Sequence, residues 1–85
     1  MLVRGSVQGV GFRWFAKKLA ESMRLAGWVR NRDDGAVELE IEGSTDSLDE
    51  FERRLRTGNP SARVKEIAAV PVAPKGDNGF EIRRG

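Results

Sequence analysis

The stretch LVRGSVQGVGFRWFAKKLAESMRLA, residues 2–26, decides the fold because its apolar pattern changes period partway along. Residues 2–7 have the composition of a short β-strand, and Gly9 and Gly11 then interrupt it with residues that adopt positive φ without steric cost. After the loop, the apolar residues recur at the spacing of one helical stripe. The stretch therefore predicts a strand, a glycine loop and a helix over about residues 12–26.

The rest of the chain predicts four further strands and one more helix. The predicted elements are a β-hairpin at 28–42 with its turn at Asp33-Asp34-Gly35, a helix that begins within 44–47 and ends at Gly58, a strand at 63–70 and a closing strand at 80–83. Each helix has one apolar stripe, and each strand has one apolar side. We therefore expect a single α+β domain over residues 1–85, with the ferredoxin-like βαββαβ order and two helices on one face of a five-stranded, mostly antiparallel sheet.

Composition removes several kinds of chemistry. The 85 residues include no cysteine and no histidine, which excludes disulfides, Cys or His zinc sites, thiolate nucleophiles and histidine bases. Lys and Arg number 15 against 13 Asp and Glu, and this net charge of +2 is too small to indicate a nucleic-acid partner. No apolar run approaches the ~18 residues of a membrane span. We expect a cytoplasmic monomer with no metal, no cofactor, and no nucleic-acid or membrane partner.

The loop before the first predicted helix is a candidate anion site. Its residues are Gly5, Ser6, Val7, Gln8, Gly9, Val10 and Gly11. Such a loop exposes unpaired N–H groups at the positive end of the helix dipole, which suits phosphate or carboxylate. The positive charge of Arg13 in the first turn destabilises the helix by about 0.3–1 kcal/mol, because it lies at the positive end of the dipole. A bound phosphate would compensate this cost, since its oxygens accept the paired hydrogen bonds of the guanidinium group. Two alternatives stay open: the glycines form an ordinary turn, and Arg13 extends into solvent beside Lys17 and Lys18.

Asn31 is unusual because Asn is disfavoured within strands, yet it ends a predicted strand here. One interpretation is turn chemistry beside Asp33-Asp34-Gly35. The other is a neutral amide that donates and accepts hydrogen bonds and so orients a water molecule. Trp14 lies off the helical stripe, and we interpret it and Trp28 as packing or partly exposed groups rather than base-stacking platforms.

Two signatures make the chain resemble the acylphosphatase family. Residues 5–13, GSVQGVGFR, match the first signature. Residues 27–31, GWVRN, followed by Gly35-Ala36-Val37 and Gly43, match the second. The similarity continues to the closing strand and so spans essentially the whole chain. One position departs from the family pattern, because Arg32 stands where many members have Thr.

The resemblance implies hydrolysis of the carboxyl-phosphate bond of acyl phosphates to a carboxylate and inorganic phosphate. It also implies that residues 5–11 form the phosphate-binding loop, that Arg13 binds the phosphoryl group, and that Asn31 positions the attacking water. A carboxylate leaving group, whose conjugate acid has a pKa of about 4–5, departs without a general acid. One arginine, one amide and the loop N–H groups are then enough, and we expect neither a metal nor a phosphoenzyme.

Two other functions are weighed against hydrolysis. A non-catalytic or carbamoyl-phosphate-handling module, like the acylphosphatase-like domain of larger hydrogenase-maturation proteins, would keep the same fold. Those proteins continue into cysteine-rich zinc segments, and the presence of both Arg13 and Asn31 favours a working hydrolase. An RNA-binding domain of the RRM type would share the element order. Its sheet would need stacking aromatics on the strands at 2–7 and 36–42, which have none, and the glutamates of the second would repel RNA.

Overall fold

The computed structural model describes residues 1–69, 76 and 78–84. Its elements are β1 (Leu2–Ser6), α1 (Phe12–Ser22), β2 (Ala26–Asn31), β3 (Val37–Glu42), α2 (Thr45–Thr57), β4 (Arg63–Ala68) and β5 (Phe80–Arg83). The expected α+β fold and element order are confirmed. Val70, the last residue of the predicted fourth strand, lies outside the described residues. Neither described helix combines the length and the apolar character that a membrane span requires.

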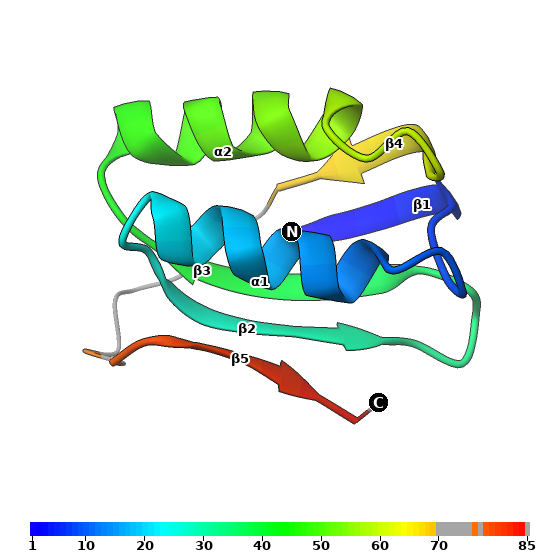
Figure 1. Cartoon of the computed structure of the whole chain (residues 1–85), viewed down its shortest axis with the longest axis horizontal. Helices are drawn as coiled ribbons and strands as arrows, with labels where there is room; N and C mark the ends of the chain where they lie inside the picture. Colours follow the sequence, from blue (N-terminus) through cyan, green and yellow to red (C-terminus); the bar gives the residue numbers. More distant parts are fainter. Residues whose placement is uncertain (70–75, 77, 85) are drawn as a thin grey trace.

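The strands form one sheet in the order β4-β1-β3-β2-β5, and both helices cover the same face of it (Figure 1). β1 pairs antiparallel with β3 and with β4, and β2 pairs antiparallel with β3. β5 is the exception, because it lies parallel to β2. Since β1 and β2 both run antiparallel to β3, their carboxyl ends lie at the same end of the sheet. The β1–α1 loop and the end of β2 are therefore neighbours.

The hydrophobic core lies between the sheet and the helices because side chains alternate along each strand. On β3, for example, Val37, Leu39 and Ile41 are buried while the intervening glutamates are only half-buried. The largest side chains with essentially no exposure are Val3, Val7, Phe12, Val29, Val37, Phe51 and Leu55. They come from three strands, the β1–α1 loop and both helices, so the core fixes α1 over the sheet.

Helix α1 ends at Ser22, so the prediction that it continues to the start of β2 is wrong. Arg24 adopts the left-handed conformation, with φ of 57°, and its N–H donates to the carbonyl of Glu21 at 3.1 Å. The N–H of Leu25 donates to the carbonyl of Ala20 at 2.9 Å. This hydrogen-bond pair is the Schellman helix end, in which glycine usually takes the left-handed position. Because arginine takes it here, the apolar pattern carried no sign of the stop.

β2 and β3 pair along their full lengths, from Ala26 opposite Glu42 to Asn31 opposite Val37. Gly27 allows this pairing, because its φ is 146° and a Cβ there would overlap the carbonyl oxygen of Glu40 on β3. Only glycine permits such a close approach of two backbones. The ladder places Asn31 at its last position, next to the turn that faces the β1–α1 loop.

Candidate active site

The β1–α1 loop begins where β1 passes closest to β4. Gly5 has φ of 136°, and a Cβ at this position would overlap the carbonyl oxygen of Arg63. The register between β1 and β4 shifts between Arg4 and Gly5, so this glycine redirects β1 as the strand leaves the sheet. Gly5 and Ser6 thus belong to β1, and the loop itself spans residues 7–11.

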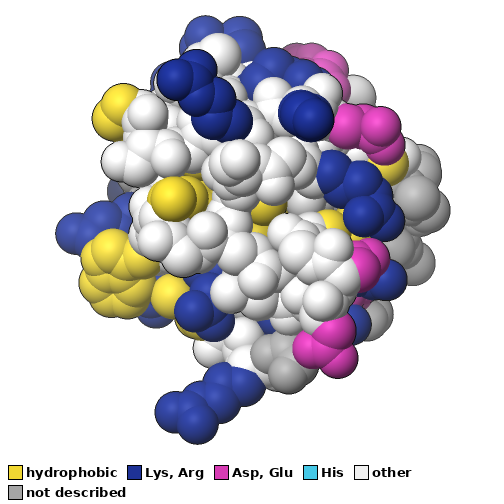
Figure 2. Space-filling view, turned by 90° about the vertical axis from the view of Figure 1, so that its right-hand side faces the viewer, with side chains coloured by type: hydrophobic (Ala, Val, Ile, Leu, Met, Phe, Trp, Pro, Cys, Tyr) yellow, Lys and Arg dark blue, Asp and Glu magenta, His cyan; other side chains and the backbone are white. Residues whose placement is uncertain are grey.

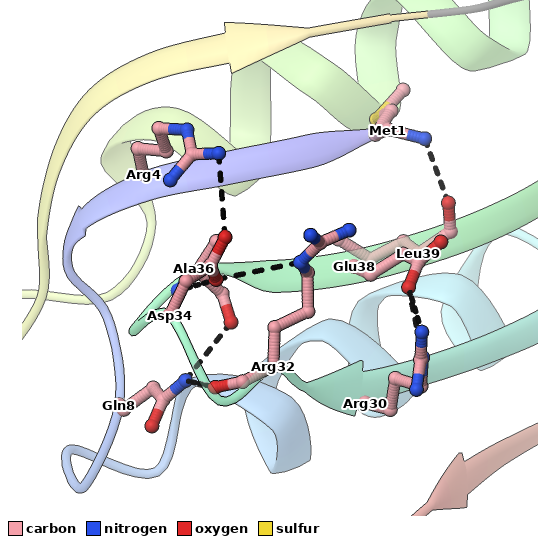
Figure 3. Close-up of polar contacts among 9 residues, drawn as sticks. All are labelled: Met1, Arg4, Gln8, Arg30, Arg32, Asp34, Ala36, Glu38 and Leu39. Atoms are coloured by element: carbon pink, nitrogen blue, oxygen red, sulfur yellow. Dashed lines mark hydrogen bonds and ion pairs between the residues drawn. The ribbon is translucent and has the colours of Figure 1, made fainter. Parts of the chain in front are cut away.

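Two side-chain amides hold the loop in place. The Nε2 group of Gln8 donates to the carbonyl oxygens of Arg32 at 2.7 Å and Ala36 at 2.9 Å, which fastens the loop to the β2–β3 turn (Figure 3). Asn59, in the connection between α2 and β4, donates from Nδ2 to the carbonyl oxygen of Val10 at 3.4 Å. The loop is therefore fixed on both sides by hydrogen bonds that leave its own N–H groups unused.

The loop leads into a helix N-terminus that carries no side-chain cap. Gly9 and Gly11 have φ of 74° and 75°, and Gly11 is the N-cap of α1, whose first turn contains no acidic residue. No hydrogen bond between described residues uses the N–H groups of residues 9–11. Helix α2 differs, because the Oγ of Ser44 accepts from the N–H of Ser47 at 3.2 Å. The start of α1 therefore offers N–H groups and a positive dipole end to an anion.

A cavity of about 160 Å³ lies against this helix N-terminus. Its lining consists of Val7, Gly9, Gly11, Phe12, Arg13, Trp14, Asn31 and Ile82. The fold thus brings together Arg13, from the first turn of α1, and Asn31, from the end of β2. Among the predicted phosphate-binding residues, Val7, Gly9, Gly11 and Arg13 line the cavity, whereas Gly5, Ser6, Gln8 and Val10 do not. In the view onto this end of the molecule, Lys and Arg side chains lie around the periphery, with Asp and Glu side chains among them on the right (Figure 2). The centre is mostly backbone and uncharged polar surface with small hydrophobic patches, and a larger hydrophobic group lies on the left.

Asn31 lines this cavity and carries an unpaired oxygen. Val29, two residues earlier on β2, is buried under the helices, so alternation directs Asn31 toward the same side of the sheet. The Oδ1 atom of Asn31 is buried and has no hydrogen-bond partner among the described residues. A buried oxygen without a hydrogen-bond partner lowers the stability of the folded state by about 1–3 kcal/mol. It is therefore suited to accept a hydrogen bond from a group that enters the cavity.

Arg13 is the cation of the cavity, and no described residue forms an ion pair or a side-chain hydrogen bond with it. The arginine next to Asn31 on β2 is engaged elsewhere, since Arg30 pairs with Glu38 of β3 at 2.6 Å (Figure 3). The guanidinium of Arg13 thus keeps its fork of donors available for the planar oxygen pairs of a phosphoryl group or carboxylate.

Arg32, which follows Asn31, belongs to a separate polar network on the β2–β3 turn (Figure 3). Its Nε donates to Oδ1 of Asp34 at 3.3 Å, and Arg4 pairs with Oδ2 of the same carboxylate at 3.5 Å. The pKa of Asp34 is lowered, chiefly by the hydrogen bond that its carboxylate accepts from the N–H of Ala36. The positive charges of Arg32 and Arg4 lower this pKa further. Arg32 does not line the cavity that contains Arg13.

A larger cavity of about 550 Å³ lies between β3, the start of β1 and helix α2. Its lining includes four acidic residues, Glu38, Glu40, Asp49 and Glu52, against Arg32 and the N-terminal Met1, so its excess of negative charge would repel a phosphate. Among the residues that the structure describes, no three Asp or Glu side chains are grouped so that they could hold a metal ion. The smaller cavity is therefore the better candidate for anion chemistry.

Four residues of the site were not predicted: Phe12, Trp14, Asn59 and Ile82. Phe12 and Trp14 gave partial signals, the first as the start of the helical stripe and the second as an aromatic residue off that stripe. Ile82 reaches the cavity because β5 lies parallel to β2, a pairing that no local pattern indicates. Asn59 donates a hydrogen bond to Val10, which lies 49 residues earlier in the chain, and no local sequence pattern indicates such a contact.

The chain is similar to known proteins over nearly its whole length. A family model described as Acylphosphatase matches residues 1–82. The acylphosphatase of Moorella thermoacetica is 46% identical over 82 residues, which cover 96% of this chain and 88% of that protein. The crystal structure of acylphosphatase from Bacillus subtilis superposes with a TM-score of 0.91 at 41% identity, covering 96% of this chain and 92% of that one.

One structural relative is much longer. The crystal structure of full-length HypF in its phosphate- and nucleotide-bound form matches with a TM-score of 0.86 at 33% identity. The match covers 96% of this chain but 11% of HypF. The fold therefore occurs both in stand-alone proteins of this size and as a small part of a larger one.

Proposed function

The chain belongs to the acylphosphatase family, and from this premise we propose that Arg13 and the β1–α1 loop bind the phosphoryl group of an acyl phosphate while Asn31 positions the attacking water. As an acylphosphatase, the protein is a hydrolase that releases a carboxylate and inorganic phosphate. One observation carries the assignment of residues: Asn31, whose buried Oδ1 has no partner among the described residues, lines the same cavity as Arg13 and the uncapped start of α1.

Phosphoryl binding uses two kinds of donor. The guanidinium of Arg13 takes two phosphoryl oxygens through its parallel N–H groups. The loop N–H groups around Gly9 and Gly11 take the remaining oxygen, assisted by the positive end of the α1 dipole. Because Gln8 holds the loop to the β2–β3 turn, these donors are arranged before the substrate arrives. Preorganised donors of this kind stabilise the charge that spreads over the equatorial oxygens in the transition state.

Asn31 supports in-line attack by water. Its Oδ1 accepts a hydrogen bond from the water and holds the water oxygen opposite the acyl oxygen. A bond forms between the water oxygen and phosphorus, and the bond from phosphorus to the acyl oxygen breaks, leaving its electron pair on the carboxylate. The proton lost by water moves to a phosphoryl oxygen, since neither Arg13 nor Asn31 acts as a base at neutral pH. No covalent phosphoenzyme forms.

The leaving group explains why this small set of residues is enough. A carboxylate departs in ionised form because its conjugate acid has a pKa of about 4–5, so no general acid is required. An alkoxide leaving group would require a proton donor, and neither Arg13 nor Asn31 is one. We therefore propose selectivity for acyl phosphates over phosphomonoesters, without a metal or another cofactor.

A hydrolysis assay tests this proposal. Benzoyl, acetyl and carbamoyl phosphate are compared with a simple phosphomonoester, with a chelator present throughout. We expect rapid hydrolysis of acyl phosphates and little hydrolysis of the monoester. Comparable turnover of the monoester would reject the argument from the leaving group, and loss of activity with the chelator would reject the metal-free mechanism.

Substitution of Arg13 tests its role in binding the phosphoryl group. Arg13→Ala removes the guanidinium fork, so we expect weaker inhibition by inorganic phosphate together with lower kcat/KM. Arg13→Lys keeps the charge and loses the bidentate geometry, so it should recover only part of the loss. Full kcat/KM and unchanged phosphate inhibition in Arg13→Ala would contradict the assigned role.

A cytoplasmic location and a monomeric state remain predictions from the sequence. Light scattering on the purified protein tests the oligomeric state directly, because a dimer would double the mass of 9.4 kDa.

A further inference from the structure

Trp14 is a large hydrophobic side chain whose surface is 56% exposed. A single exposed apolar residue needs no explanation by itself. Its position does, because Trp14 follows Arg13 directly and lines the cavity that Arg13 and Asn31 share. The folded protein thus keeps an indole in contact with solvent at the entrance to its anion site.

The lining of this cavity divides into a polar part and an apolar part. Arg13, Asn31 and the loop glycines form the polar part, and Phe12, Trp14 and Ile82 form most of the apolar part. Phe12 is 1% exposed and so belongs to the interior wall. Ile82 is only partly buried and Trp14 is largely exposed, so these two form the rim.

Neighbouring contacts hold both parts of this rim. The Nζ of Lys18 lies 5.8 Å from the centroid of the Trp14 ring, a cation–π contact that covers one region of the indole. Lys17 donates to the carbonyl oxygen of Phe80 at 3.2 Å, which ties α1 to β5, the strand that contains Ile82. The ring of Trp14 and the side chain of Ile82 are therefore held on the same cavity by the packing of α1 against β5.

We propose that Trp14 and Ile82 form an acyl shelf that contacts the acyl group of the substrate and makes the enzyme favour aromatic and bulky apolar acyl phosphates over acetyl phosphate. The proposal rests on the proposed function, because it takes the phosphoryl group to be bound by Arg13 and the loop. With the phosphoryl group in the polar part, the acyl group extends to the apolar rim. A benzoyl ring there covers indole surface that is otherwise exposed to water, whereas an acetyl group covers little of it.

The test compares two substrates and two tryptophans. The ratio of kcat/KM for benzoyl phosphate to kcat/KM for acetyl phosphate is measured for the unmodified protein, Trp14→Ala and Trp14→Phe. An aromatic contact contributes about 0.5–1.5 kcal/mol, so Trp14→Ala should lower this ratio about 2- to 12-fold, mainly through KM for benzoyl phosphate. Trp14→Phe should retain most of the ratio. Trp28→Ala is the matched control, since Trp28 makes cation–π contacts with Arg30 and Arg83 and does not line the cavity, and it should leave the ratio unchanged.

A binding measurement distinguishes failure of the shelf from failure of the hydrolase. Phenacylphosphonate and acetonylphosphonate replace the bridging oxygen with a methylene group, so their dissociation constants do not depend on turnover. The acyl shelf predicts that Trp14→Ala weakens binding of the first about 2- to 12-fold more than binding of the second. An unchanged ratio in both experiments would overturn the shelf even if hydrolysis is normal. Phosphonate binding with the predicted ratio but without hydrolysis would support the shelf and overturn the proposed catalysis instead.

Discussion

Replacing Gln8 tests how the active-site loop is held. Gln8→Ala removes two hydrogen bonds, to the carbonyl oxygens of Arg32 and Ala36. Neither carbonyl becomes unpaired, because Ala36 still accepts from the N–H of Arg32 at 2.8 Å and Arg32 still accepts from the N–H of Gly35 at 3.3 Å. Each lost hydrogen bond therefore costs only its net contribution of about 0.5–1.5 kcal/mol, and the free energy of unfolding should fall by about 1–3 kcal/mol.

The same substitution should lower both stability and catalysis. In a domain of this size, the expected loss of stability lowers Tm by about 4–24 °C, which calorimetry measures. Release of the loop from the β2–β3 turn displaces its N–H groups relative to Asn31. A displacement of about 1 Å near the reacting atoms can cost 100-fold, so we expect kcat/KM for benzoyl phosphate to fall about tenfold or more in fully folded protein.

Asn59→Ala is the comparison for Gln8→Ala, since it removes the longer hydrogen bond, of 3.4 Å, that holds the other side of the loop. It also removes the hydrogen bond that Oδ1 of Asn59 accepts from the N–H of Ser61 at 3.0 Å, so its effect on Tm is not a measure of the loop contact. Its effect on kcat/KM should be smaller than that of Gln8→Ala. The reasoning is refuted if Gln8→Ala keeps full kcat/KM at a temperature where it is folded, or if Asn59→Ala lowers kcat/KM more than Gln8→Ala does.

Two further predictions concern stability. Gly27→Ala should lower the free energy of unfolding by about 3 kcal/mol or more, measured in urea, because the added Cβ meets the backbone carbonyl of Glu40 and φ is 146°. Gly9→Ala is the control, because its added Cβ meets no atom and only the positive φ should cost about 1–2 kcal/mol. An equally small loss for Gly27→Ala would contradict the prediction. Hydrogen bonds from Arg53 and Arg54 lower the pKa of Glu50 from 4.5 to about 2, so this carboxylate stabilises the fold above pH 4.5 and loses that effect as pH falls toward 2. At low salt, Glu50→Gln should therefore lose stability less steeply than the unmodified protein between pH 4.5 and 2, and parallel curves would show that the ion pairs contribute nothing.

Local pattern was sufficient to predict the elements that have their own periodicity or capping residues. The strand, glycine loop and helix were predictable from residues 2–22, because apolar spacing changes where the structure changes. The end of α1 was not, since Arg24 adopts a left-handed conformation that is usual for glycine. Its strain is offset by the local Schellman hydrogen bonds and by the burial of Leu25, and that burial is a tertiary effect.

The site was predictable in part for the same reason. Arg13 was detectable because a cation at a helix start contradicts the dipole, and Asn31 because an amide ends a strand of apolar residues. That both face one cavity depends on β1 and β2 running in the same direction on either side of β3, which is a property of the sheet. The contribution of Ile82 depends further on β5 pairing in parallel with β2.

Steady-state kinetics of Asn31→Ala test the central claim most directly. The substitution removes the unpaired Oδ1 and leaves Arg13 and the loop unchanged, so phosphate should inhibit as well as before. Without an acceptor to hold the water, we expect kcat on benzoyl phosphate to fall about 100-fold or more. Full kcat in a folded Asn31→Ala protein would contradict the account, and equal losses of phosphate affinity and kcat would place Asn31 in binding instead of water positioning.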